Sequence, residues 1–472
     1  MPDVEYDIAV VGGGPGGYVA ALRAAQLGAK VVLAEKDKVG GTCLNRGCIP
    51  VKAMTRSVEV FLDAKRGEEF GVKVSGVEVD FPKLMARKQQ VVDRLVSGVE
   101  GLLQGSNVTV MRGSAKLASP RRIAVDGKEV AAKKIIIATG SVPSRVPIPG
   151  LDLPGVITSD DLLQTNRVPA SLVIIGGGVI GMEFASIFAA MGTKVTVVEM
   201  LPLIMPPVDE ELARRFTQIV RRQGMSIVTG AKVTGVKQAE GGLDVAYETS
   251  SGAQSAKAEI VLVSVGRSPY TDGLGLAEVG ITMNRRAIAV NDHLQTNIDG
   301  VYAIGDVTGR IMLAHVASYD GEVAVENALG KHSQATDYRV VPSVIYTIPE
   351  ISGVGLTEKQ ARERGTPFKV GRFPLSASGR AQTLGETTGM MKVIADTETK
   401  ELLGVHMMGP RACDLIAEAA LAIKLEATAQ DIAETIHAHP TLPEAFREAT
   451  LEHLDGAIHV LSRPWATPGP SM

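Results

Sequence analysis

Two stretches of this chain share one pattern of apolar and polar positions. Residues 6–36 and 171–200 each begin with a short apolar run, pass through a cluster of glycines, and continue with apolar residues at helical spacing. Each helical pattern ends at a glycine, Gly28 or Gly192, and a second apolar run ending in an acid follows it. The pattern therefore predicts a strand, a glycine turn, an amphipathic helix and a second strand, twice in one chain.

The glycines of both turns follow the spacing G-x-G-x-x-G. They are Gly12, Gly14 and Gly17 in the first copy and Gly176, Gly178 and Gly181 in the second. The first glycine allows a tight turn, the second lets the backbone approach a pyrophosphate, and the third lets helix and sheet pack closely. The acids Glu35 and Glu199 are placed to accept hydrogen bonds from ribose hydroxyls, and Glu199 would repel a 2′-phosphate. Two such units predict two dinucleotides, with NAD preferred to NADP at the second.

Composition limits the class of protein. The chain has 472 residues, of which 45% are apolar and 21% charged, as in a globular protein of roughly two to four domains. Its formal net charge of -3 gives no basic field, so we expect no nucleic-acid partner. Asp3, Glu5 and Asp7 stand where a signal peptide has basic residues, and glycines and Arg23 interrupt the apolar run. We therefore expect no membrane span and a cytoplasmic protein.

Three cysteines, Cys43, Cys48 and Cys413, are too few for a structural disulfide framework. The close pair in CLNRGC is typical of a catalytic or metal-binding site, and the alternative is two buried thiols. Because no Cys or His cluster completes a zinc shell, we expect no metal. Cys48 precedes Pro50 and an apolar helical pattern, which predicts a helix N-terminus that stabilises a thiolate. The four intervening residues give the sulfurs enough slack to form a small, reducible disulfide loop.

Three further motifs follow in order along the chain. They are GGTCLNRGCIPVK at 40–52, AIGDVTG at 303–309 and HPTLPE at 439–444. With the two glycine units, these motifs resemble the pyridine nucleotide-disulfide oxidoreductases, from about residue 5 to about residue 460. The resemblance implies an α/β fold class, with two Rossmann-like dinucleotide-binding domains, for FAD and for NAD, and a C-terminal α+β dimerisation domain.

The expected domain boundaries follow from the same resemblance and from two proline-rich crossings, VPSRVPIPG and VGRSPYTDG. They are 1–149 for the FAD-binding domain, 150–269 for the NAD-binding domain, 270–341 for a central segment returning to the FAD domain, and 342–472 for the interface domain. The tail from about residue 462 is rich in proline, and we expect it to be disordered.

The resemblance implies roles for residues around the cysteines. Cys43 faces the external dithiol substrate, whereas Cys48 faces the flavin and passes electrons to it. Lys52 lies near the flavin ring and pairs with the acid Glu183. Val51 departs from the family, which commonly has a small hydroxylic residue there, and this puts only local packing or a hydrogen bond in doubt.

A base is needed to deprotonate the attacking thiol, because an ordinary thiol is mostly protonated at neutral pH. Of eight histidines, His437 and His439 compete for this role in IHAHPTLPE. We choose His439, because it precedes Pro440 and stands five residues before Glu444, as in the His and Glu pair of the family; Glu444 would orient its ring. The family donates this histidine to the partner's active site, so the resemblance implies an obligate homodimer with two composite sites.

The remaining cofactor contacts are implied by position in the family pattern. Asp306 binds the ribityl chain of FAD, and Ala314 offers a backbone contact near the flavin ring. The other positions are Gly113 and Ala115 for the adenine, Thr139, Gly140 and Ser141 for a second flavin fingerprint, and Val233 and Gly266 for the nicotinamide nucleotide.

The function implied is oxidation of protein-bound dihydrolipoamide to lipoamide through a Cys43–Cys48 redox disulfide and FAD, with reduction of NAD+ to NADH. The lipoyl group would belong to an acyltransferase or carrier protein of a 2-oxoacid dehydrogenase, glycine cleavage or acetoin system. One alternative is a disulfide reductase resembling glutathione reductase, which would need basic residues where Glu199 stands. Another is a non-catalytic flavoprotein that serves assembly, against which the intact Cys, His, Glu and Lys set argues.

Overall fold

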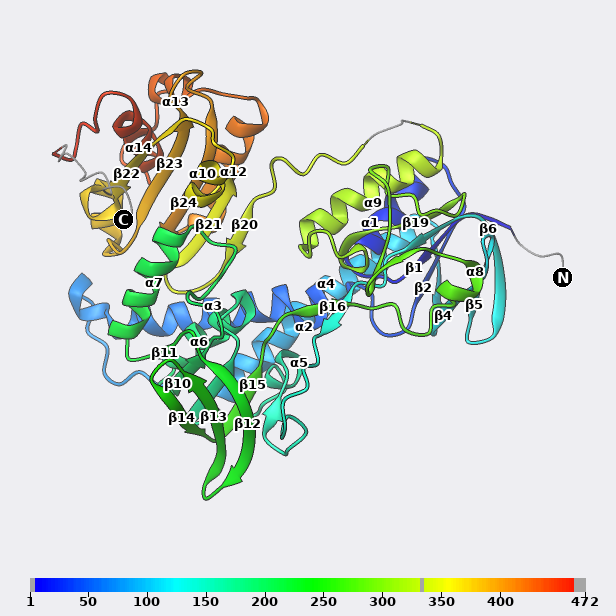
Figure 1. The fold of residues 1–472 in the computed structure, drawn as a ribbon, viewed down its shortest axis with the longest axis horizontal. Coiled ribbons are helices and arrows are strands. Elements are labelled where there is room, and N and C mark those ends of the chain that lie inside the picture. The colour runs from blue at the N-terminus through cyan, green and yellow to red at the C-terminus, as the bar shows by residue number, and fades with distance from the viewer. Residues whose placement is uncertain (1–4, 332–334, 462–472) are drawn as a thin grey trace. The chain divides into compact units, whose positions relative to one another are not determined.

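The computed structural model describes residues 5–331 and 335–461, so the tail predicted to be disordered lies outside the described residues. The chain divides into two compact units, whose elements are drawn in Figure 1. The first comprises Met1–Gly176, Ala190–Val195 and Val233–Asp337, and the second Gly177–Ala189, Thr196–Lys232 and Tyr338–Met472. Within the described ranges, no helix combines the length and apolar character needed to cross a bilayer.

The main sheet of the first unit contains both strands of the first strand–turn–helix–strand unit. Its strands are β1 Tyr6–Val11, β2 Val31–Glu35, β3 Thr109–Arg112, β4 Ala115–Ser119, β5 Arg122–Val125, β6 Lys128–Ile137 and β19 Val301–Ala303. Their order is β3-β2-β1-β6-β5-β4, and β19 also pairs with β6. The strands β3, β2, β1, β6 and β19 run parallel, whereas β4, β5 and β6 form an antiparallel ladder.

Both faces of this sheet are buried. Ile8 and Val10 of β1 belong to one buried cluster, whereas Ala9 and Val11 belong to another. Since successive side chains of a strand point to opposite faces, these clusters lie on the two sides of the sheet. This double burial explains why the strands read as continuous apolar runs. The helices α1 Pro15–Gln26 and α9 Ala314–Ala328 are among those that contribute to the first cluster.

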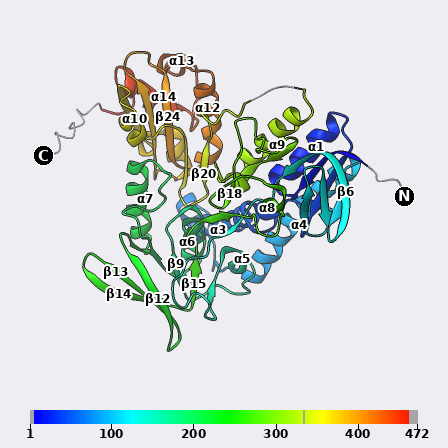
Figure 2. The same ribbon diagram turned by 45° about the vertical axis from the view of Figure 1, so that its right-hand side comes forward.

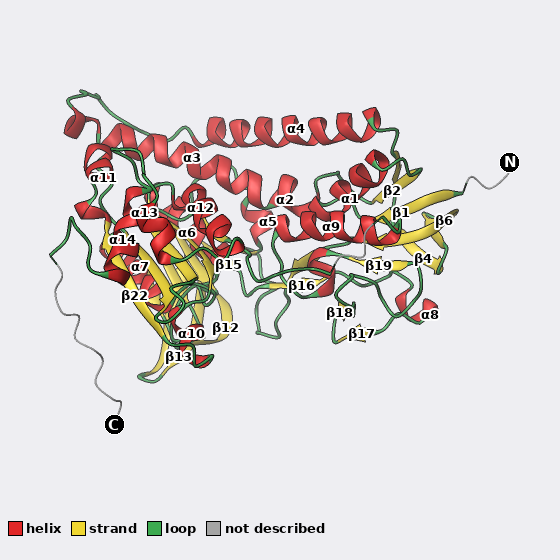
Figure 3. Cartoon of the chain, turned by 90° about the horizontal axis from the view of Figure 1, so that it is seen from above, coloured by secondary structure: helices red, strands yellow, loops and turns green. Residues whose placement is uncertain are grey.

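The segment after β2 forms the helices that carry the cysteines. It contains α2 Gly41–Arg46, α3 Cys48–Lys65, the short 3-10 helix η1 Gly67–Phe70 and α4 Phe81–Gly105. Figure 3 shows α3 and α4 running side by side. Cys48 is the first residue of α3, so the prediction that it begins a helix is confirmed.

The two predicted crossings lie next to each other. Strand β7, Ser141–Pro143, comes from the first crossing and pairs antiparallel with β16, Arg267–Pro269, from the second. The segment between the two crossings, residues 144–266, therefore starts and ends at neighbouring strands. The remaining elements in and at the edge of this unit are β8 Val156–Ile157, α5 Ser159–Leu162, β9 Ser171–Ile175, β12 Lys232–Ala239, β13 Gly242–Thr249, β14 Gly252–Ala258, β15 Ile260–Val263, α8 Leu276–Val279, β17 Met283–Asn284, β18 Ala287–Ile288 and η2 Gly305–Thr308. The strands β12, β13 and β14 form a separate sheet, which Figure 2 shows.

The second unit contains the helix of the second glycine repeat. Its first elements are α6 Val179–Ala190, β10 Lys194–Val198, α7 Glu210–Arg222 and β11 Ser226–Val228, with β10 and β11 paired in parallel. The prediction of an amphipathic helix is wrong for α6, because every residue from Gly181 to Phe188 is buried. A helix that is apolar nearly all round is covered on more than one face, and Glu183 and Ser186 are buried with it.

The C-terminal part of the second unit is one antiparallel sheet with helices. Its elements are β20 Ser343–Ile345, β21 Glu350–Gly355, α10 Glu358–Glu363, β22 Phe368–Pro374, η3 Leu375–Ala377, α11 Gly379–Leu384, β23 Met390–Asp396, β24 Leu402–Gly409, α12 Ala412–Lys424, α13 Ala429–Glu434 and α14 Glu444–Leu454. The strand order is β20-β21-β24-β23-β22, and α12, α13 and α14 share its buried apolar cluster. The two strand–turn–helix–strand units and this α+β domain match the predicted fold class. The predicted domain boundaries stay a prediction.

Candidate active site

Each repeat holds its acid against its own glycine turn in the same way. Glu35 Oε2 accepts the Gly13 N–H at 2.7 Å, and Glu199 Oε2 accepts the Gly177 N–H at 2.6 Å. The second oxygen of each acid accepts the N–H of the second residue after it, at 2.7 Å in both copies. Both carboxylates are buried. The internal repeat found in the sequence is therefore also a repeat of polar geometry.

The first glycine turn fits a bound pyrophosphate. Gly12 has φ +104°, and a Cβ there would lie 2.4 Å from the Ala138 carbonyl oxygen. A Cβ on Gly17 would lie 1.8 Å from the Gly12 carbonyl oxygen, so only glycine lets the helix approach the strand this closely. The N-cap residue of α1 is Gly14, and Pro15 follows. The helix N-terminus therefore offers N–H groups to an anion with no capping side chain in between.

The second turn repeats these features. Gly176 has φ +103°, and a Cβ there would lie 2.5 Å from the Ser264 carbonyl oxygen. A Cβ on Gly178 would meet no atom within 4 Å, which leaves that stretch of backbone open to a close ligand. Gly181 is buried in the first turn of α6. The residues present therefore fit the second predicted dinucleotide as well.

Cys43 and Cys48 come from successive helices, α2 and α3, and both are free thiols in this structure. The pKa of Cys43 is raised, first by its hydrogen bond with Cys48 and then by burial, although the charge of Lys52 opposes this. This direction favours the protonated form of Cys43. A thiolate at Cys48 would lie at the N-terminus of α3, which stabilises negative charge. This polarity is the one that the predicted order of the two sulfurs requires.

The surroundings of the cysteines are ordered by local contacts. Asn45 Nδ2 donates to the carbonyl oxygens of Val39 and Gly41, at 3.1 and 2.9 Å, and so holds the segment between the two sulfurs. Lys52 lies one helical turn after Cys48. Val51 is buried, so the departure from the family pattern places a buried apolar side chain at this position.

Glu183, the expected partner of Lys52, lies on α6 in the second unit. Its Oε1 accepts the Tyr346 N–H at 2.9 Å, so the strand end after β20 orients this carboxylate. The pairing of Lys52 with Glu183 stays a prediction.

Arg267 is a site residue that the sequence reasoning missed. Its Nε and Nη2 donate to Oγ and the carbonyl oxygen of Ser141, both at 2.7 Å, and Ser141 Oγ donates to Asp306 Oδ2 at 2.5 Å. The pKa of Arg267 is lowered, because burial outweighs the opposing charges of Asp306, Asp160 and Cys48. Arg267 therefore lies within the field of both the predicted ribityl-binding acid and the redox thiol. A basic residue directly after Gly266, inside a crossing, was the available signal.

The predicted flavin fingerprint is brought to Asp306 by the same crossing. Thr139 Oγ1 donates to the Tyr270 carbonyl oxygen at 2.7 Å, and the Tyr270 N–H donates to the Gly140 carbonyl oxygen at 2.9 Å. Asp306 lies in η2, and Ala314 is the first residue of α9, the next helix. These residues come from three distant stretches of sequence, and the fold gathers them.

The positions predicted to contact the adenine and the nicotinamide nucleotide have the following surroundings. The Gly113 N–H donates to the Glu35 carbonyl oxygen at 2.9 Å, which places the predicted adenine segment beside the acid of the first repeat. Ala115 begins β4, and Val233 is buried in β12. Gly266 has φ +104°, and its carbonyl oxygen accepts an N–H from the first crossing at 3.0 Å.

His439 and Glu444 form the predicted pair. His439 Nδ1 lies 2.7 Å from Glu444 Oε1, and the Thr441 N–H donates to Glu444 Oε2 at 2.6 Å. Burial would raise the pKa of Glu444, but the hydrogen bonds from Thr441 and His439 lower it. An ionised Glu444 accepts a hydrogen bond from Nδ1–H, which leaves Nε2 as the unprotonated nitrogen that the predicted base would use. The His439 side chain is 78% exposed in the single chain, so this nitrogen is accessible.

His437 has both ring nitrogens engaged. Nδ1 lies 2.9 Å from the Thr435 carbonyl oxygen, and Nε2 lies 2.9 Å from Glu418 Oε1. It therefore holds the loop before His439 and has no nitrogen directed at a substrate. This difference in geometry favours His439 over His437 as the base.

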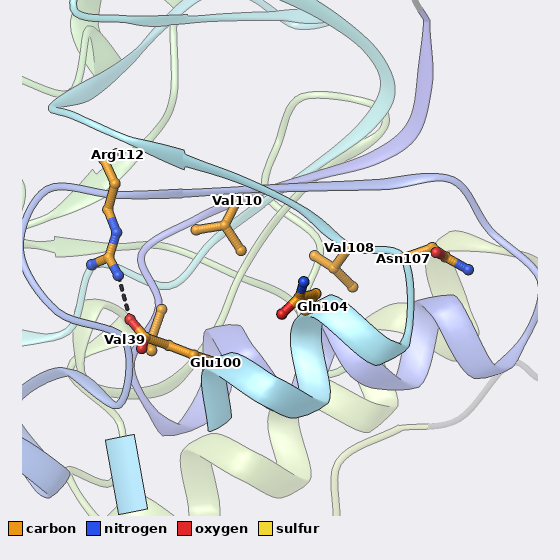
Figure 4. A pocket seen from close by; sticks show the side chains of 7 residues that line it. All are labelled: Val39, Glu100, Gln104, Asn107, Val108, Val110 and Arg112. Atoms are coloured by element: carbon orange, nitrogen blue, oxygen red, sulfur yellow. Dashed lines mark hydrogen bonds and ion pairs between the residues drawn. The ribbon is translucent and has the colours of Figure 1, made fainter. Parts of the chain in front are cut away.

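A hollow beside β3 has a different character (Figure 4). Its walls come from the residues Val39, Glu100, Gln104, Asn107, Val108, Val110 and Arg112. Arg112 Nη2 pairs with Glu100 Oε1 at 2.5 Å, and Nη1 donates to the Asp37 carbonyl oxygen at 2.5 Å. Because its cation is engaged by the protein, we assign no phosphate to this hollow.

Comparisons with known proteins agree with the class of enzyme that this site defines. The family model for pyridine nucleotide-disulphide oxidoreductases matches residues 6–321, and the model for the dimerisation domain of that family matches residues 341–450. The chain belongs to the pyridine nucleotide-disulphide oxidoreductase family. The predicted family, the two dinucleotide cofactors FAD and NAD, and a homodimer built on the C-terminal domain are thereby confirmed.

Several curated relatives share one name. The dihydrolipoyl dehydrogenase of Bacillus subtilis is 43% identical, over 96% of this chain and 99% of that protein. The dihydrolipoyl dehydrogenase of Thermus scotoductus is 44% identical, over 97% and 99%, and the mitochondrial one of Pisum sativum is 43% identical, over 97% and 93%. The solved structure of the HOCl-induced flavoprotein disulfide reductase RclA from Escherichia coli has a TM-score of 0.86 at 31% identity, and covers 94% of this chain and 99% of that one.

Proposed function

We propose that this protein is a dihydrolipoamide dehydrogenase, a homodimer that oxidises protein-bound dihydrolipoamide and reduces NAD+. The observation that carries the proposal is the cysteine pair on successive helices, Cys43 in α2 and Cys48 as the first residue of α3, with a hydrogen bond between the two sulfurs. The His439–Glu444 pair and the full-length similarity to dihydrolipoyl dehydrogenases support it.

The chain supplies residues suited to hold both cofactors. The first glycine turn, Glu35, Ser141 and Asp306 would hold FAD, and the second glycine turn and Glu199 would hold NAD, with Val233 and Gly266 beside it. When bound, these groups supply the two-electron chemistry, in which FAD accepts an electron pair and NAD+ accepts a hydride. The protein supplies the binding, the proton transfers and the disulfide exchange.

The exchange steps follow from the chain's own residues. His439 Nε2 takes the proton of one substrate thiol, and the resulting thiolate attacks Cys43 of the Cys43–Cys48 disulfide. The disulfide breaks, and Cys48 leaves as a thiolate at the N-terminus of α3. The second substrate thiol then gives its proton to Cys43 as its sulfur displaces Cys43 from the mixed disulfide. This yields lipoamide, the Cys43 thiol and the Cys48 thiolate, and the proton of the first substrate thiol stays on His439. Glu444 stabilises the protonated imidazole between these steps.

We also propose the finer features of this assembly. His439 serves the cysteines of the partner subunit, so each active site is composite. The lipoyl group belongs to an acyltransferase or carrier protein of a 2-oxoacid dehydrogenase, glycine cleavage or acetoin system. A reducible cysteine pair suits a reducing compartment, which supports a cytoplasmic location. The domain boundaries at 149, 269 and 341 belong to the same proposal.

Anaerobic titration of the FAD-loaded homodimer with dihydrolipoamide tests the proposed function. We expect a long-wavelength absorption band from charge transfer between the Cys48 thiolate and the flavin, and the same band with NADH. Parallel turnover assays should show activity with lipoamide and NADH but not with glutathione disulfide and NADPH. A protein without flavin, or one that turns over the glutathione pair preferentially, would contradict the proposal.

Replacing Glu199 by serine is expected to weaken the preference for NAD+. The variant loses a charged acceptor for ribose hydroxyls, which should raise KM for NAD+ by about 10- to 100-fold. It also loses the charge that repels a 2′-phosphate, so the ratio of kcat/KM for NADP+ to that for NAD+ should rise. Steady-state kinetics with both coenzymes measure this ratio, and an unchanged ratio would remove Glu199 from the site.

A further inference from the structure

Lys392 is a buried cation on a strand of the C-terminal sheet. It lies on β23, and its side chain is 1% exposed. Its Nζ lies 2.7 Å from Glu358 Oε2, 2.8 Å from Asp209 Oδ1 and 3.2 Å from Glu211 Oε2. An ammonium group is costly to bury unless it is paired and hydrogen-bonded, so these acids compensate its charge. The contacts join the sheet to α7 and α10.

Lys392 belongs to a row of cross-strand neighbours in the C-terminal sheet. Gly353, His406, Lys392 and Arg372 are register partners on β21, β24, β23 and β22. A Cβ on Gly353 would lie 2.5 Å from His406 Nδ1, so the glycine makes room for the ring. Arg372 adds contacts at 2.8 Å to Glu211 and 3.3 Å to Glu358. The sheet thus presents two adjacent cations to α7 and α10.

Asp209 is the centre of the acidic side. Its Oδ1 accepts the Glu211 N–H at 3.1 Å and so caps α7, and its Oδ2 accepts the Glu358 N–H at 3.1 Å in the first turn of α10. Burial would raise the pKa of Asp209, but the charge and hydrogen bond of Lys392 lower it, so the carboxylate stays ionised. Lys392, Arg372, Asp209, Glu211 and Glu358 form what we call the ionic cluster. Figures 1 and 2 both show α7 beside this sheet.

The ionic cluster lies at one end of a loop whose other end is Glu199. Loop 200–208 connects β10 to α7. Near its start, the Leu201 N–H donates to Glu199 at 2.7 Å; in its middle, the Met205 N–H donates to the Gly177 carbonyl oxygen at 2.8 Å. Ile204 and Met205 are fully buried. The loop therefore packs on the second glycine turn, and Asp209 follows its last residue.

We propose that Lys392 is a positioning residue for the second dinucleotide site, because it holds Asp209 and thereby keeps loop 200–208 packed against Gly177 and Glu199. The inference rests on the proposed function, since it assumes that this turn binds NAD. A residue of the C-terminal sheet, far along the chain from the glycine motif, then sets the affinity for the adenosine half of the coenzyme. Lys392 itself touches neither substrate nor cofactor.

Calorimetric titration with ADP-ribose tests this role in the FAD-loaded full-length homodimer. ADP-ribose carries the adenosine and pyrophosphate of NAD but accepts no hydride, so it reports binding without turnover. In Lys392→Met we expect Kd for ADP-ribose and KM for NAD+ to rise about 10-fold. The values of kcat and of KM for dihydrolipoamide should stay within about twofold, because no residue of the ionic cluster takes part in the steps at the cysteines and His439. Amide hydrogen exchange in loop 200–208 should become faster.

Two further variants serve as a control and as a replacement for Lys392→Met. Arg214→Gln is the matched control, since Arg214 pairs with Glu210 at 3.3 Å on the exposed side of α7 and should leave Kd unchanged. Glu358→Gln replaces Lys392→Met if that protein does not fold, and should raise Kd about threefold. A folded Lys392→Met dimer with wild-type Kd and loop exchange would overturn the inference. Wild-type protein that fails to bind ADP-ribose would instead overturn the proposed function.

Discussion

Lipoamide-dependent activity is expected to fall by on the order of 10⁴-fold or more when Cys48 is replaced by serine, because no disulfide can then form or be reduced. The flavin and nucleotide sites do not use this sulfur for binding. The variant should therefore bind FAD normally and still oxidise NADH with an artificial electron acceptor. Stopped-flow reduction by dihydrolipoamide should show no charge-transfer band, since the proposed donor thiolate is missing.

Cys413→Ser is the matched control for this substitution. Cys413 is the third cysteine of the chain, and its thiol is buried on α12 near the carbonyl oxygens of Ile345 and Ile351. Burial and the charge of Glu350 raise its pKa, so it is a poor candidate for redox exchange at neutral pH. Its replacement should leave lipoamide turnover and the charge-transfer band in place. A Cys48→Ser variant that still turns over lipoamide at the wild-type rate would refute the dithiol mechanism.

Replacing His439 by glutamine is expected to lower kcat/KM for dihydrolipoamide by about 10²- to 10⁴-fold, the usual contribution of a general base. Glutamine keeps the size of the side chain but cannot take a proton from the substrate thiol. Reduction by NADH should be little affected, because that half-reaction needs no base for a substrate thiol. Glu444→Gln should give a smaller loss, since it removes only the carboxylate that orients the ring. His437→Gln is the neighbouring control and should stay near wild type.

A subunit-exchange experiment separates a composite site from a site within one chain. Cys48→Ser and His439→Gln homodimers are each inactive by the expectations above. If His439 serves the cysteines of the partner subunit, a hybrid dimer contains one intact site and one doubly defective site. Random exchange makes half of the dimers hybrid, so the mixture should recover about a quarter of the wild-type activity. A mixture that stays inactive after verified exchange would place His439 and the cysteines of one site in the same chain.

Local features of the site could be predicted from the sequence. The glycine turns, the acids after the second strands, the helix start at Cys48 and the His439–Glu444 pair each involve residues within one strand–turn–helix unit or one turn. Over so short a span, spacing along the chain determines spacing in space, because backbone geometry leaves few conformations. The repeat predicted equivalent positions for Glu35 and Glu199, and the structure adds that both acids accept backbone N–H groups in the same way.

Other features depended on contacts between distant segments. The helical pattern of 179–190 predicted an amphipathic helix, but α6 is buried on nearly all sides, which depends on what the rest of the chain packs around it. Arg267 is engaged by Ser141, which lies 126 residues earlier, because two crossings pair as strands. The local signal for Arg267, a basic residue directly after Gly266, was too weak to mark it, since an arginine in a loop ordinarily stays in solvent.

Lys392 shows most clearly where sequence reasoning ends. A lysine within the apolar run of 390–395 reads as the solvent-facing position of a strand, yet its side chain is buried beneath acids from two helices. Short-range backbone geometry let the sequence predict the two dinucleotide units and the helix start at Cys48, whereas the roles of the cysteines and of His439 were predicted from the family resemblance. Only the tertiary structure decided which buried charges compensate one another. That pairing requires segments as far apart as Asp209 and Lys392, separated by 183 residues, to meet out of water.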